Sequence, residues 1–387
     1  MFKLSDTDSL FMRIMVYSDT PECIEATNSL HQDMGDDALL ALSERNDVAS
    51  LVAHALLQSG DKNLAACWKE VHTATLNRIS AYLSELDHIA DRLAERGIPL
   101  VALKNGGIAR GIYPCLGCSP MGDIDVLVEN RHFRKAHEIL LESGYHFQFR
   151  NPMEEADLET AEEDGGAEYW KVLSGGEKLW LELQWRPVAG RWLRPDQEPS
   201  AKELMARSID IAGSAVRLLS PEDNLLQVAL HTAKHTYVRA PGFRLHLDVV
   251  RIVQAYPELD WQIFVTRVLS LQIKAAVYFS LAIPNALFAA AIPDWVLDRL
   301  RPSLWKEKMI VNWLQRVGLF NPREKKFSKP GYILFNMLLY DDLKGLLHAI
   351  FPNRAFMQAR YGADSSGCIL LAHLRRLFNL TFSRTNT

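Results

Sequence analysis

Two short stretches of the chain decide its fold: LKNGG at residues 103–107 and GDIDVLV at residues 122–128. The second is polar at its start and apolar at its end, which predicts a strand that runs into a core. The apolar run at residues 98–103 predicts a second, buried strand. In a strand, residues two apart share a face, so Asp123 and Asp125 would present two carboxylates side by side.

Such a pair of carboxylates predicts a metal site that also takes a nucleotide. Two like charges at close range repel each other, and a divalent cation relieves that repulsion. Hard oxygen ligands suit Mg²⁺, or Mn²⁺ in its place, and Mg²⁺ completes its shell with water and substrate phosphates. The plain alternative is that Asp123 and Asp125 cap the strand or pair with arginines.

Glu182 is the candidate for a third carboxylate. It lies in the expected strand 179–185, where Leu181 and Leu183 occupy one face and Glu182 and Gln184 the other. An acid inside an apolar strand needs a partner, because burying it alone is costly. Three acids can hold two cations, and Glu182 could also help to deprotonate an acceptor. The alternative is an ordinary strand acid in a salt bridge.

A glycine turn lies between the first strand and the helix expected to follow it, which should reach residues 113–114. At Gly106 and Gly107 the backbone could approach phosphates closely, and a helix N-terminus supplies free N–H groups. Lys104 would end the strand and could neutralise a phosphate charge. Alone this turn is weak evidence, and a lysine at a strand end is commonplace, but the Asp-x-Asp strand downstream strengthens the prediction.

The rest of the chain predicts an α+β fold, with a small mixed β-sheet core flanked by N-terminal and C-terminal helical regions. Helical spacing of apolar residues covers the chain up to residue 97, and the predicted α/β core spans 98–219. Strands are expected at 145–149, 167–173 and 209–218, and a helix at 131–143. Ser220-Pro221 predicts the start of a C-terminal helical domain at 220–387, because serine caps helices and proline suits the first position.

Composition narrows the class of protein. The net charge of −4 argues against broad, sequence-blind nucleic-acid binding. Five cysteines in 387 residues fit free thiols in a reducing compartment, and no basic-then-apolar signal segment begins the chain, so a cytoplasmic protein is expected. Residues 275–292 carry no charge, but Pro284 interrupts them, which favours two short buried helical pieces over a membrane span.

The run from Leu103 to Gly144 resembles the uncharacterised-nucleotidyltransferase family of the DNA-polymerase-β-like superfamily. The resemblance rests on Lys104 with its glycine turn, Tyr113-Pro114, the Met121–Asp125 strand and Gly144-Tyr145. It continues in the acidic strand that ends in Trp185-Arg186, and it covers roughly residues 98–253. The chain departs from the family pattern at Asn105, Ser119 and Gln184, where the family usually has glycine, arginine and histidine.

The resemblance also matches a later helix with His231 and His235, followed by Asp248, and implies that these residues face the nucleotide or acceptor. Four residues apart, His231 and His235 share a helix face. They could ligate a metal, but Thr232 occupies the position at which a zincin has its glutamate. The simpler alternative is that both histidines are hydrogen-bonded side chains of the core or of a pocket. Asp248 could simply pair with Arg244.

The resemblance implies a Mg²⁺- or Mn²⁺-dependent nucleotidyltransferase that moves a nucleoside monophosphate from a triphosphate, ATP included, to an acceptor. Asp123, Asp125 and Glu182 would hold metal, and Lys104, Gly106, Gly107, His231 and His235 would bind nucleotide. The acceptor is expected to be a small molecule, peptide or protein rather than nucleic acid, and no membrane partner is expected. The alternatives are an inactive nucleotide- or protein-binding scaffold and a toxin-like enzyme that modifies tRNA or protein.

One further motif is Cys115-x-x-Cys118, which has the spacing of half a zinc site. The sequence offers no second cysteine pair, and His132, the nearest histidine in the sequence, lies beyond the Asp strand. Spacing alone therefore favours plain free thiols over zinc or redox chemistry.

Overall fold

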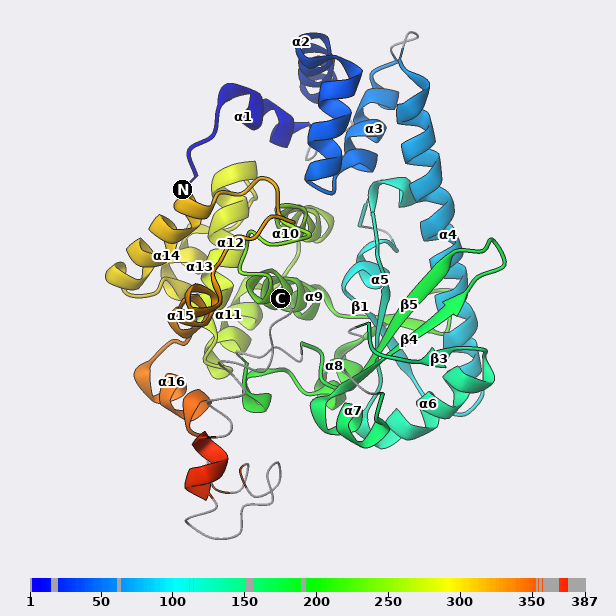
Figure 1. Cartoon of the computed structure of the whole chain (residues 1–387), viewed down its shortest axis with the longest axis vertical. Helices are drawn as coiled ribbons and strands as arrows, with labels where there is room; N and C mark the ends of the chain where they lie inside the picture. The colour runs from blue at the N-terminus through cyan, green and yellow to red at the C-terminus, as the bar shows by residue number, and fades with distance from the viewer. Residues whose placement is uncertain are drawn as a thin grey trace.

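The computed structural model describes residues 2–14, 20–60, 64–110, 112–113, 115–150, 156–188, 193–352, 354, 357 and 369–374. Figure 1 shows three regions: N-terminal helices, a sheet with its own helices, and a bundle of C-terminal helices. The predicted α+β class, with helical regions on both sides of a mixed sheet, is confirmed. Pro114 and Cys368 lie outside the described residues.

A seven-stranded mixed sheet, in the order β3-β4-β5-β2-β1-β7-β6, forms the centre of the second region. Its strands are β1 (Leu100–Leu103), β2 (Ile124–Leu127), β3 (His146–Phe147), β4 (Gly166–Val172), β5 (Lys178–Gln184), β6 (Ile209–Asp210) and β7 (Val216–Leu218). β2 pairs antiparallel with β1 and parallel with β5. The single strand expected at 209–218 is wrong: it is a hairpin of β6 and β7, which turns at Gly213 with a positive φ of 76°.

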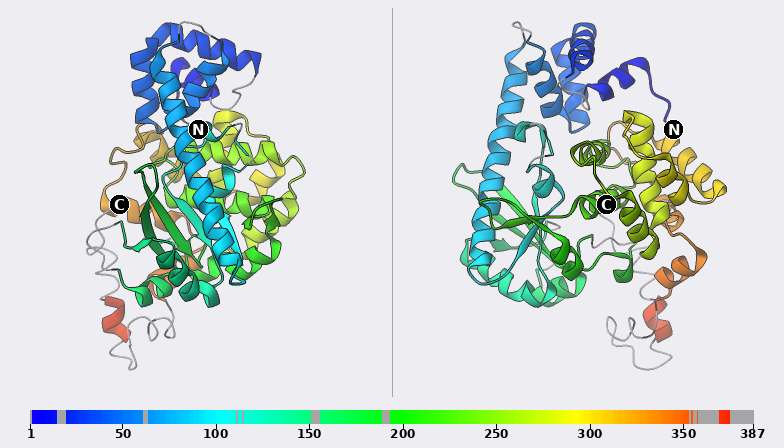
Figure 2. Two further views of the ribbon diagram at one scale, coloured as in Figure 1. Left: turned by 90° about the vertical axis from the view of Figure 1, so that its right-hand side faces the viewer. Right: turned by 180° about the vertical axis from the view of Figure 1, so that it is seen from behind.

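One face of this sheet is apolar and covered by helices. The even-numbered residues of β1 and β2 and the odd-numbered leucines of β5 pack with α4 (Ala66–Ala94) and α6 (Phe133–Glu142) in a single core. Figure 2 shows α4 crossing this face. The opposite face carries Val101, Leu103 and Leu127, which pack against α8 (Ala201–Arg207), and it also carries the acids. The alternation of strand side chains thus separates the core from the polar face.

Shorter helical elements connect the strands. They are α5 (Lys104–Ile108), α7 (Leu158–Asp164) and the 3-10 turns η1 (Leu116–Cys118), η2 (Asn130–His132) and η3 (Pro195–Gln197). The helix expected to run from the glycine turn to residues 113–114 is much shorter and ends at Ile108.

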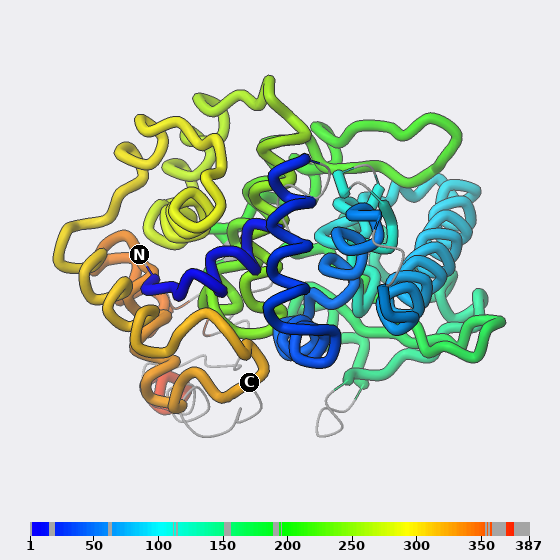
Figure 3. Tube along the Cα trace, turned by 90° about the horizontal axis from the view of Figure 1, so that it is seen from above, coloured from blue at the N-terminus to red at the C-terminus, as the bar shows by residue number. Residues whose placement is uncertain are grey.

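The N-terminal and C-terminal helices share one apolar core. The first group is α1 (Asp6–Arg13), α2 (Pro21–Arg45), α3 (Ala49–Gln58) and the beginning of α4. The second is α9 (Pro221–Lys234), α10 (Arg244–Ala255), α11 (Trp261–Ser270), α12 (Lys274–Phe288), α13 (Asp294–Leu300), α14 (Leu304–Val317), α15 (Lys329–Leu338) and α16 (Leu343–Ile350). Buried side chains from both groups form a continuous cluster. Figure 3 shows the N-terminal helices lying across the top, between α4 and the C-terminal bundle.

Most of the uncharged segment 275–292 lies in one buried helix, α12, which continues through Pro284 and ends at Phe288. The expected break into two pieces is therefore wrong. Pro284 lies near the C-terminal end of α12, where few intrahelical hydrogen bonds remain to be lost, and packing against α9 and α10 supports the helix. Within the described part of the chain, no helix is both long enough and apolar enough to span a membrane.

Candidate active site

Strand register brings two of the three predicted acids together. Asp125 on β2 lies directly opposite Glu182 on β5, so both side chains lie on the polar face of the sheet. Asp123 precedes β2 by one residue and keeps the alternation of Asp125. Asp125 is almost fully buried, whereas the side chains of Asp123 and Glu182 are 19% and 23% exposed. The site is therefore closed at Asp125 and open to solvent at its other two acids.

Lys104 is held directly against these acids. Its residue begins α5 with a φ of 47°, a left-handed conformation that is uncommon for a residue with a side chain. The ammonium nitrogen lies 2.5 Å from Asp125 Oδ1 and 3.7 Å from Glu182 Oε2, and the side chain is buried. Strain of this kind gathers at functional sites, and here it accompanies the placement of a cation beside two acids.

Gln184 lies two residues after Glu182 on the same face of β5, and it joins the two acids. Its amide nitrogen donates to Asp125 Oδ1 at 2.9 Å and to Glu182 Oε2 at 2.8 Å. Its amide oxygen is buried without a hydrogen-bond partner among the described residues. The site therefore contains a spare oxygen acceptor next to two carboxylates.

Arg150 occupies the open side of the site, and sequence reasoning missed it. Its guanidinium donates to Asp123 and lies 3.5 Å from Glu182 Oε1, with its carbon 5.2 Å from the centre of the Trp180 ring. It follows the short strand β3, far from the Asp strand in sequence. Asp123 is thus paired with an arginine, as the plain alternative for the carboxylates supposed.

The charges in the cluster balance. Burial raises the pKa of Asp125 well above its usual value, although Lys104 opposes this effect. Burial also acts to raise the pKa of Glu182, but the attraction of Lys104 and the hydrogen bond with Asp125 outweigh it and lower that pKa to about 2. Burial opposes the charge of Lys104, yet its acidic neighbours raise its pKa above the usual value. Burial and Lys104 thus shift the pKa values of Asp125 and Glu182 in opposite directions, and the titrations of the two carboxyls are linked, with Lys104 as their shared counter-charge.

The paired histidines lie on α9, which contacts α5 beside the cluster. His231 and His235 meet edge to face with ring centres 4.7 Å apart. Burial and the neighbouring cations, Lys104 among them, lower the pKa of His235 to about 3 and that of His231 well below its usual value. Both rings are therefore neutral near pH 7. Lys234 between them donates to Val188 O at 3.3 Å, and burial followed by repulsion from Lys104 lowers its pKa.

The glycine pair is buried in the first turn of α5. A β-carbon on Gly107 would lie 3.2 Å from Ala102 O, while one on Gly106 would make ordinary contacts. Neither glycine has a positive φ, whereas Lys104, two residues before Gly106, has one. The structure therefore explains Gly107 by tight packing of the turn on β1, and phosphate binding at this pair remains a prediction.

Two residues of α10 contact the loop that precedes Asp123. Arg244 on α10 donates to Pro120 O, and Tyr113 OH donates to Asp248 Oδ1 at 2.5 Å. Asp248 therefore accepts from a tyrosine, and Arg244 acts on it through the attraction of its charge. Burial raises the pKa of Asp248 to about 6, against the pull of Arg244.

The donor set fits a divalent cation in its chemistry. Three carboxylates and a spare amide oxygen are the hard ligands that Mg²⁺ and Mn²⁺ prefer. In the described part of the chain, however, the carboxylates do not belong to a group of three ligand atoms within 4.8 Å of one another. Arg150 and Lys104 engage them instead, so a cation at Asp123 would displace Arg150.

The family of the chain follows from a comparison with family models. The model described as "Uncharacterised nucleotidyltransferase" matches residues 32–289, about two thirds of the chain. The chain belongs to this nucleotidyltransferase family. The match confirms the family suggested by the motifs and extends well before and after them. A search of curated proteins finds no match to this nucleotidyltransferase-family chain.

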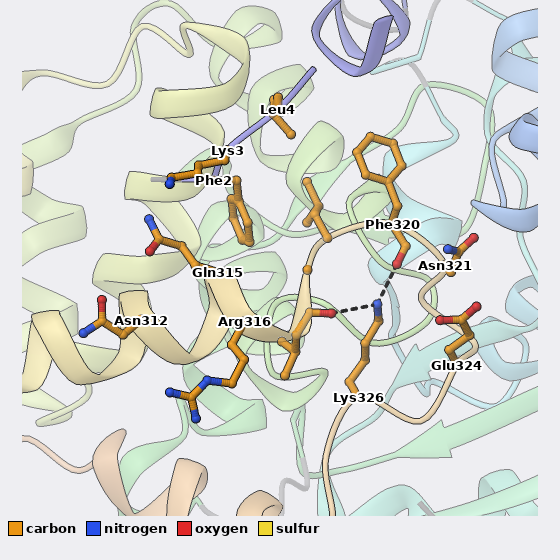
Figure 4. Close-up of a pocket in the computed structure, with 13 residues that line it drawn as sticks. Phe2, Lys3, Leu4, Asn312, Gln315, Arg316, Phe320, Asn321, Glu324 and Lys326 are labelled. Carbon is orange, nitrogen blue, oxygen red and sulfur yellow. Dashed lines mark hydrogen bonds between the residues drawn. The ribbon is translucent and has the colours of Figure 1, made fainter. Parts of the chain in front are cut away.

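One surface hollow of the described residues has none of the three acids in its lining. It has a volume of about 610 Å³ and lies between the N-terminal segment and the end of α14, where Lys326 donates to Val317 O and Phe320 O at 3.2 and 2.6 Å (Figure 4). Its lining comes from residues 2–4 and 312–326.

Proposed function

We propose that the protein is a Mg²⁺- or Mn²⁺-dependent nucleotidyltransferase that transfers a nucleoside monophosphate from a nucleoside triphosphate to an acceptor. An acceptor oxygen forms a bond to the α-phosphorus, the bond from that phosphorus to the bridging oxygen breaks, and pyrophosphate leaves. The acceptor proton passes to solvent. The observation that carries the proposal is the register of Asp125 opposite Glu182, with Asp123 on the same face.

The residues divide the work as follows. Asp123, Asp125 and Glu182 would hold the cation, which when bound supplies positive charge to the transferred phosphoryl group and to the leaving group. Lys104 keeps the buried end of the site neutral, because it lies 2.5 Å from Asp125. Arg150, released from Asp123, would be free to bind the triphosphate. Catalysis then depends on positioning and charge neutralisation.

His231, His235, Gly106 and Gly107 would complete the nucleotide pocket. The two histidines are neutral near pH 7, so they would contribute hydrogen bonds or stacking rather than charge. Because the pKa of Glu182 is about 2 without metal, it accepts a proton poorly, and we assign it to metal binding. The net charge of −4 favours a small molecule, peptide or protein as acceptor.

The test combines binding with chemistry. Each of the four ribonucleoside triphosphates is added with Mg²⁺ or Mn²⁺, and thermal stability and pyrophosphate release are measured. Asp123→Ala and Asp125→Asn should abolish the metal-dependent shift, whereas Asp298→Asn, an exposed acid on α13, should retain it. A ligand at ~100 times its Kd should add about 2.7 kcal/mol of stability. No shift with any triphosphate, in a folded wild type, would refute the proposal.

A second candidate is a nucleotide- or protein-binding scaffold without activity. The specific observation in its favour is that Arg150 and Lys104 already neutralise the acids, with Gln184 in place of the usual histidine. It predicts that a triphosphate raises the thermal stability of the protein but that no pyrophosphate is released with any metal. The protein should also release no pyrophosphate when cell extract is added as a source of acceptors.

A further inference from the structure

Four side chains that are far apart in the sequence converge outside the acidic site. They are His54 on α3, His72 on α4, and Cys115 and Cys118 at the turn η1. One ligand atom from each lies within 4.8 Å of all the others. The Cys-x-x-Cys motif, half a zinc site by its spacing, thus has its two missing ligands in space.

The two nitrogen-to-sulfur distances match a tetrahedral centre. His72 Nε2 lies 3.3 Å and His54 Nδ1 3.5 Å from Cys115 Sγ. Zinc bonds of about 2.0–2.1 Å to nitrogen and 2.3 Å to sulfur place tetrahedral ligand atoms about 3.3–3.8 Å apart. The two sulfurs, at 3.0 Å, lie well beyond the ~2.05 Å of a disulfide but closer together than the ~3.8 Å of two sulfurs on one tetrahedral zinc, so they would separate on binding the ion.

The backbone is shaped around these ligands. The 3-10 turn is closed by Cys118 N donating to Cys115 O at 3.0 Å, so both sulfurs point to one side. Gly117 lies inside the turn, and a β-carbon there would come within 2.5 Å of His72 Nε2. Only glycine therefore lets the turn approach the imidazole this closely. Cys118 and His54 are buried, which shields the centre from bulk water.

We infer that His54, His72, Cys115 and Cys118 form a structural Zn²⁺ site. Two thiolates and two imidazoles in a tetrahedron select zinc over Mg²⁺ or Ca²⁺, which prefer oxygen ligands. A Rieske-type [2Fe–2S] cluster also takes two cysteines and two histidines, but on two different irons, whereas here both imidazoles lie within 3.5 Å of Cys115 Sγ, as at a single ion. The four positions are filled by protein, so the centre is closed and serves structure rather than catalysis. The inference goes beyond the proposed function and does not depend on it.

The zinc would tie three parts of the molecule together. α3 and α4 belong to the N-terminal helices, and the turn η1 belongs to the loop that leads into the Asp strand. Cys118 precedes Asp123 by five residues, and Pro120 between them is held from the other side by Arg244. The centre would therefore fix the entry of the loop into β2 while α10 fixes its middle.

The experiment measures metal in the purified full chain. We expect about one zinc per chain after dialysis against a weak chelator, and roughly a tenth of that or less in Cys118→Ser and in His72→Gln. Cys67→Ser and His88→Gln provide matched controls: both residues lie on α4 and outside the cluster, and both variants should retain full zinc. Asp123→Ala and Asp125→Asn should also retain it, because they address the other site.

A second measurement does not depend on variants that fold. X-ray absorption of the zinc-loaded wild type should show two sulfurs at about 2.3 Å and two nitrogens at about 2.0 Å. Co²⁺ in place of zinc should give the strong visible bands of a tetrahedral thiolate site. Three results would each overturn the inference. The first is a zinc shell of oxygens only, and the second is loss of zinc in the aspartate variants alone. The third is a wild type that is purified without zinc, contains a Cys115–Cys118 disulfide and takes up no metal after reduction.

Discussion

Removal of the buried cation tests the charge balance of the candidate active site directly. Lys104→Met replaces the ammonium group with an apolar side chain that fills the same space. In the wild type the ammonium lies 2.5 Å from Asp125 and 3.7 Å from Glu182. The variant therefore leaves a buried carboxylate without its cationic partner.

The expected loss of stability follows from that geometry. A charge pair separated by 3.7 Å, as between Lys104 and Glu182, is worth about 4.5 kcal/mol at an effective dielectric constant of ~20. Removal of one partner of a buried pair costs about 3–5 kcal/mol, which agrees. With an unfolding entropy near 2.1 cal/mol/K per residue, 387 residues give about 0.8 kcal/mol/K, so the Tm should fall by about 4–6 °C.

The loss should grow with pH. Without Lys104, the largest opposing effect is gone, so burial should raise the pKa of Glu182 above its wild-type value, although the hydrogen bond with Asp125 and the charges of Lys234 and Arg150 still act to lower it. A group whose folded pKa is raised contributes stability that is present at low pH and lost as pH rises through that pKa. The deficit of the variant relative to wild type should therefore be smaller at low pH and larger at high pH.

The assay is thermal unfolding followed by circular dichroism at several pH values, with Lys135→Met as control. Lys135 lies 2.6 Å from Glu138, a similar distance, but both side chains are about half exposed, so its loss should cost at most about 1 kcal/mol. Mn²⁺ should raise the Tm of the Lys104 variant more than that of wild type, because its acids lack a counter-charge. A deficit no larger than that of the control, or one that is constant from pH 5 to 8, would refute the reasoning.

Three further predictions concern other parts of the structure. The unfolding free energy of Asp248→Asn, measured by denaturant titration, should rise by up to about 3 kcal/mol relative to wild type between pH 4 and pH 8. The reason is that the wild-type carboxyl, with its pKa raised to about 6, destabilises the fold once it ionises. A difference in unfolding free energy that does not change with pH would contradict this. Gly117→Ala should lower stability by about 1–3 kcal/mol and release zinc in a chelator assay, since its methyl meets His72, and unchanged zinc affinity would contradict it. Arg150→Gln should tighten Mn²⁺ binding roughly tenfold in calorimetry by freeing Asp123 of one charged hydrogen bond, and weaker Mn²⁺ binding would show that Arg150 does not compete with the metal.

Local patterns in the sequence predicted the elements that carry the acids. The strands expected at 123–128 and 179–185 are β2 and β5 within one or two residues, and the expected helix start at Ser220 is confirmed by its cap to Asp223. Alternation also predicted correctly that Leu181 and Leu183 share a face opposite Glu182. These features depend on neighbours along the chain, and neighbours along the chain are what a sequence shows directly.

Contacts between distant segments could not be predicted in the same way. Arg150 reaches Asp123 because β3 and β4 pair beside β5, and no spacing in the sequence signals that. His54 and His72 meet Cys115 only because α3 and α4 pack on the turn η1. The Cys-x-x-Cys motif was the signal in the sequence, but its histidine partners lie 43 and 61 residues before Cys115, whereas the nearest histidine in the sequence, His132, lies after it.

The helix α4 sets a practical limit on dissecting this protein. It is 29 residues long, about 43 Å, and its first turns pack in the core of the helical regions while its later turns cover the sheet. A fragment that starts at residue 98 would lose Leu86, Ile89 and Leu93 and expose the apolar side of β1 and β2 to water. The smallest fragment that retains a covered sheet must therefore begin before α4, with the helices that hold it in place.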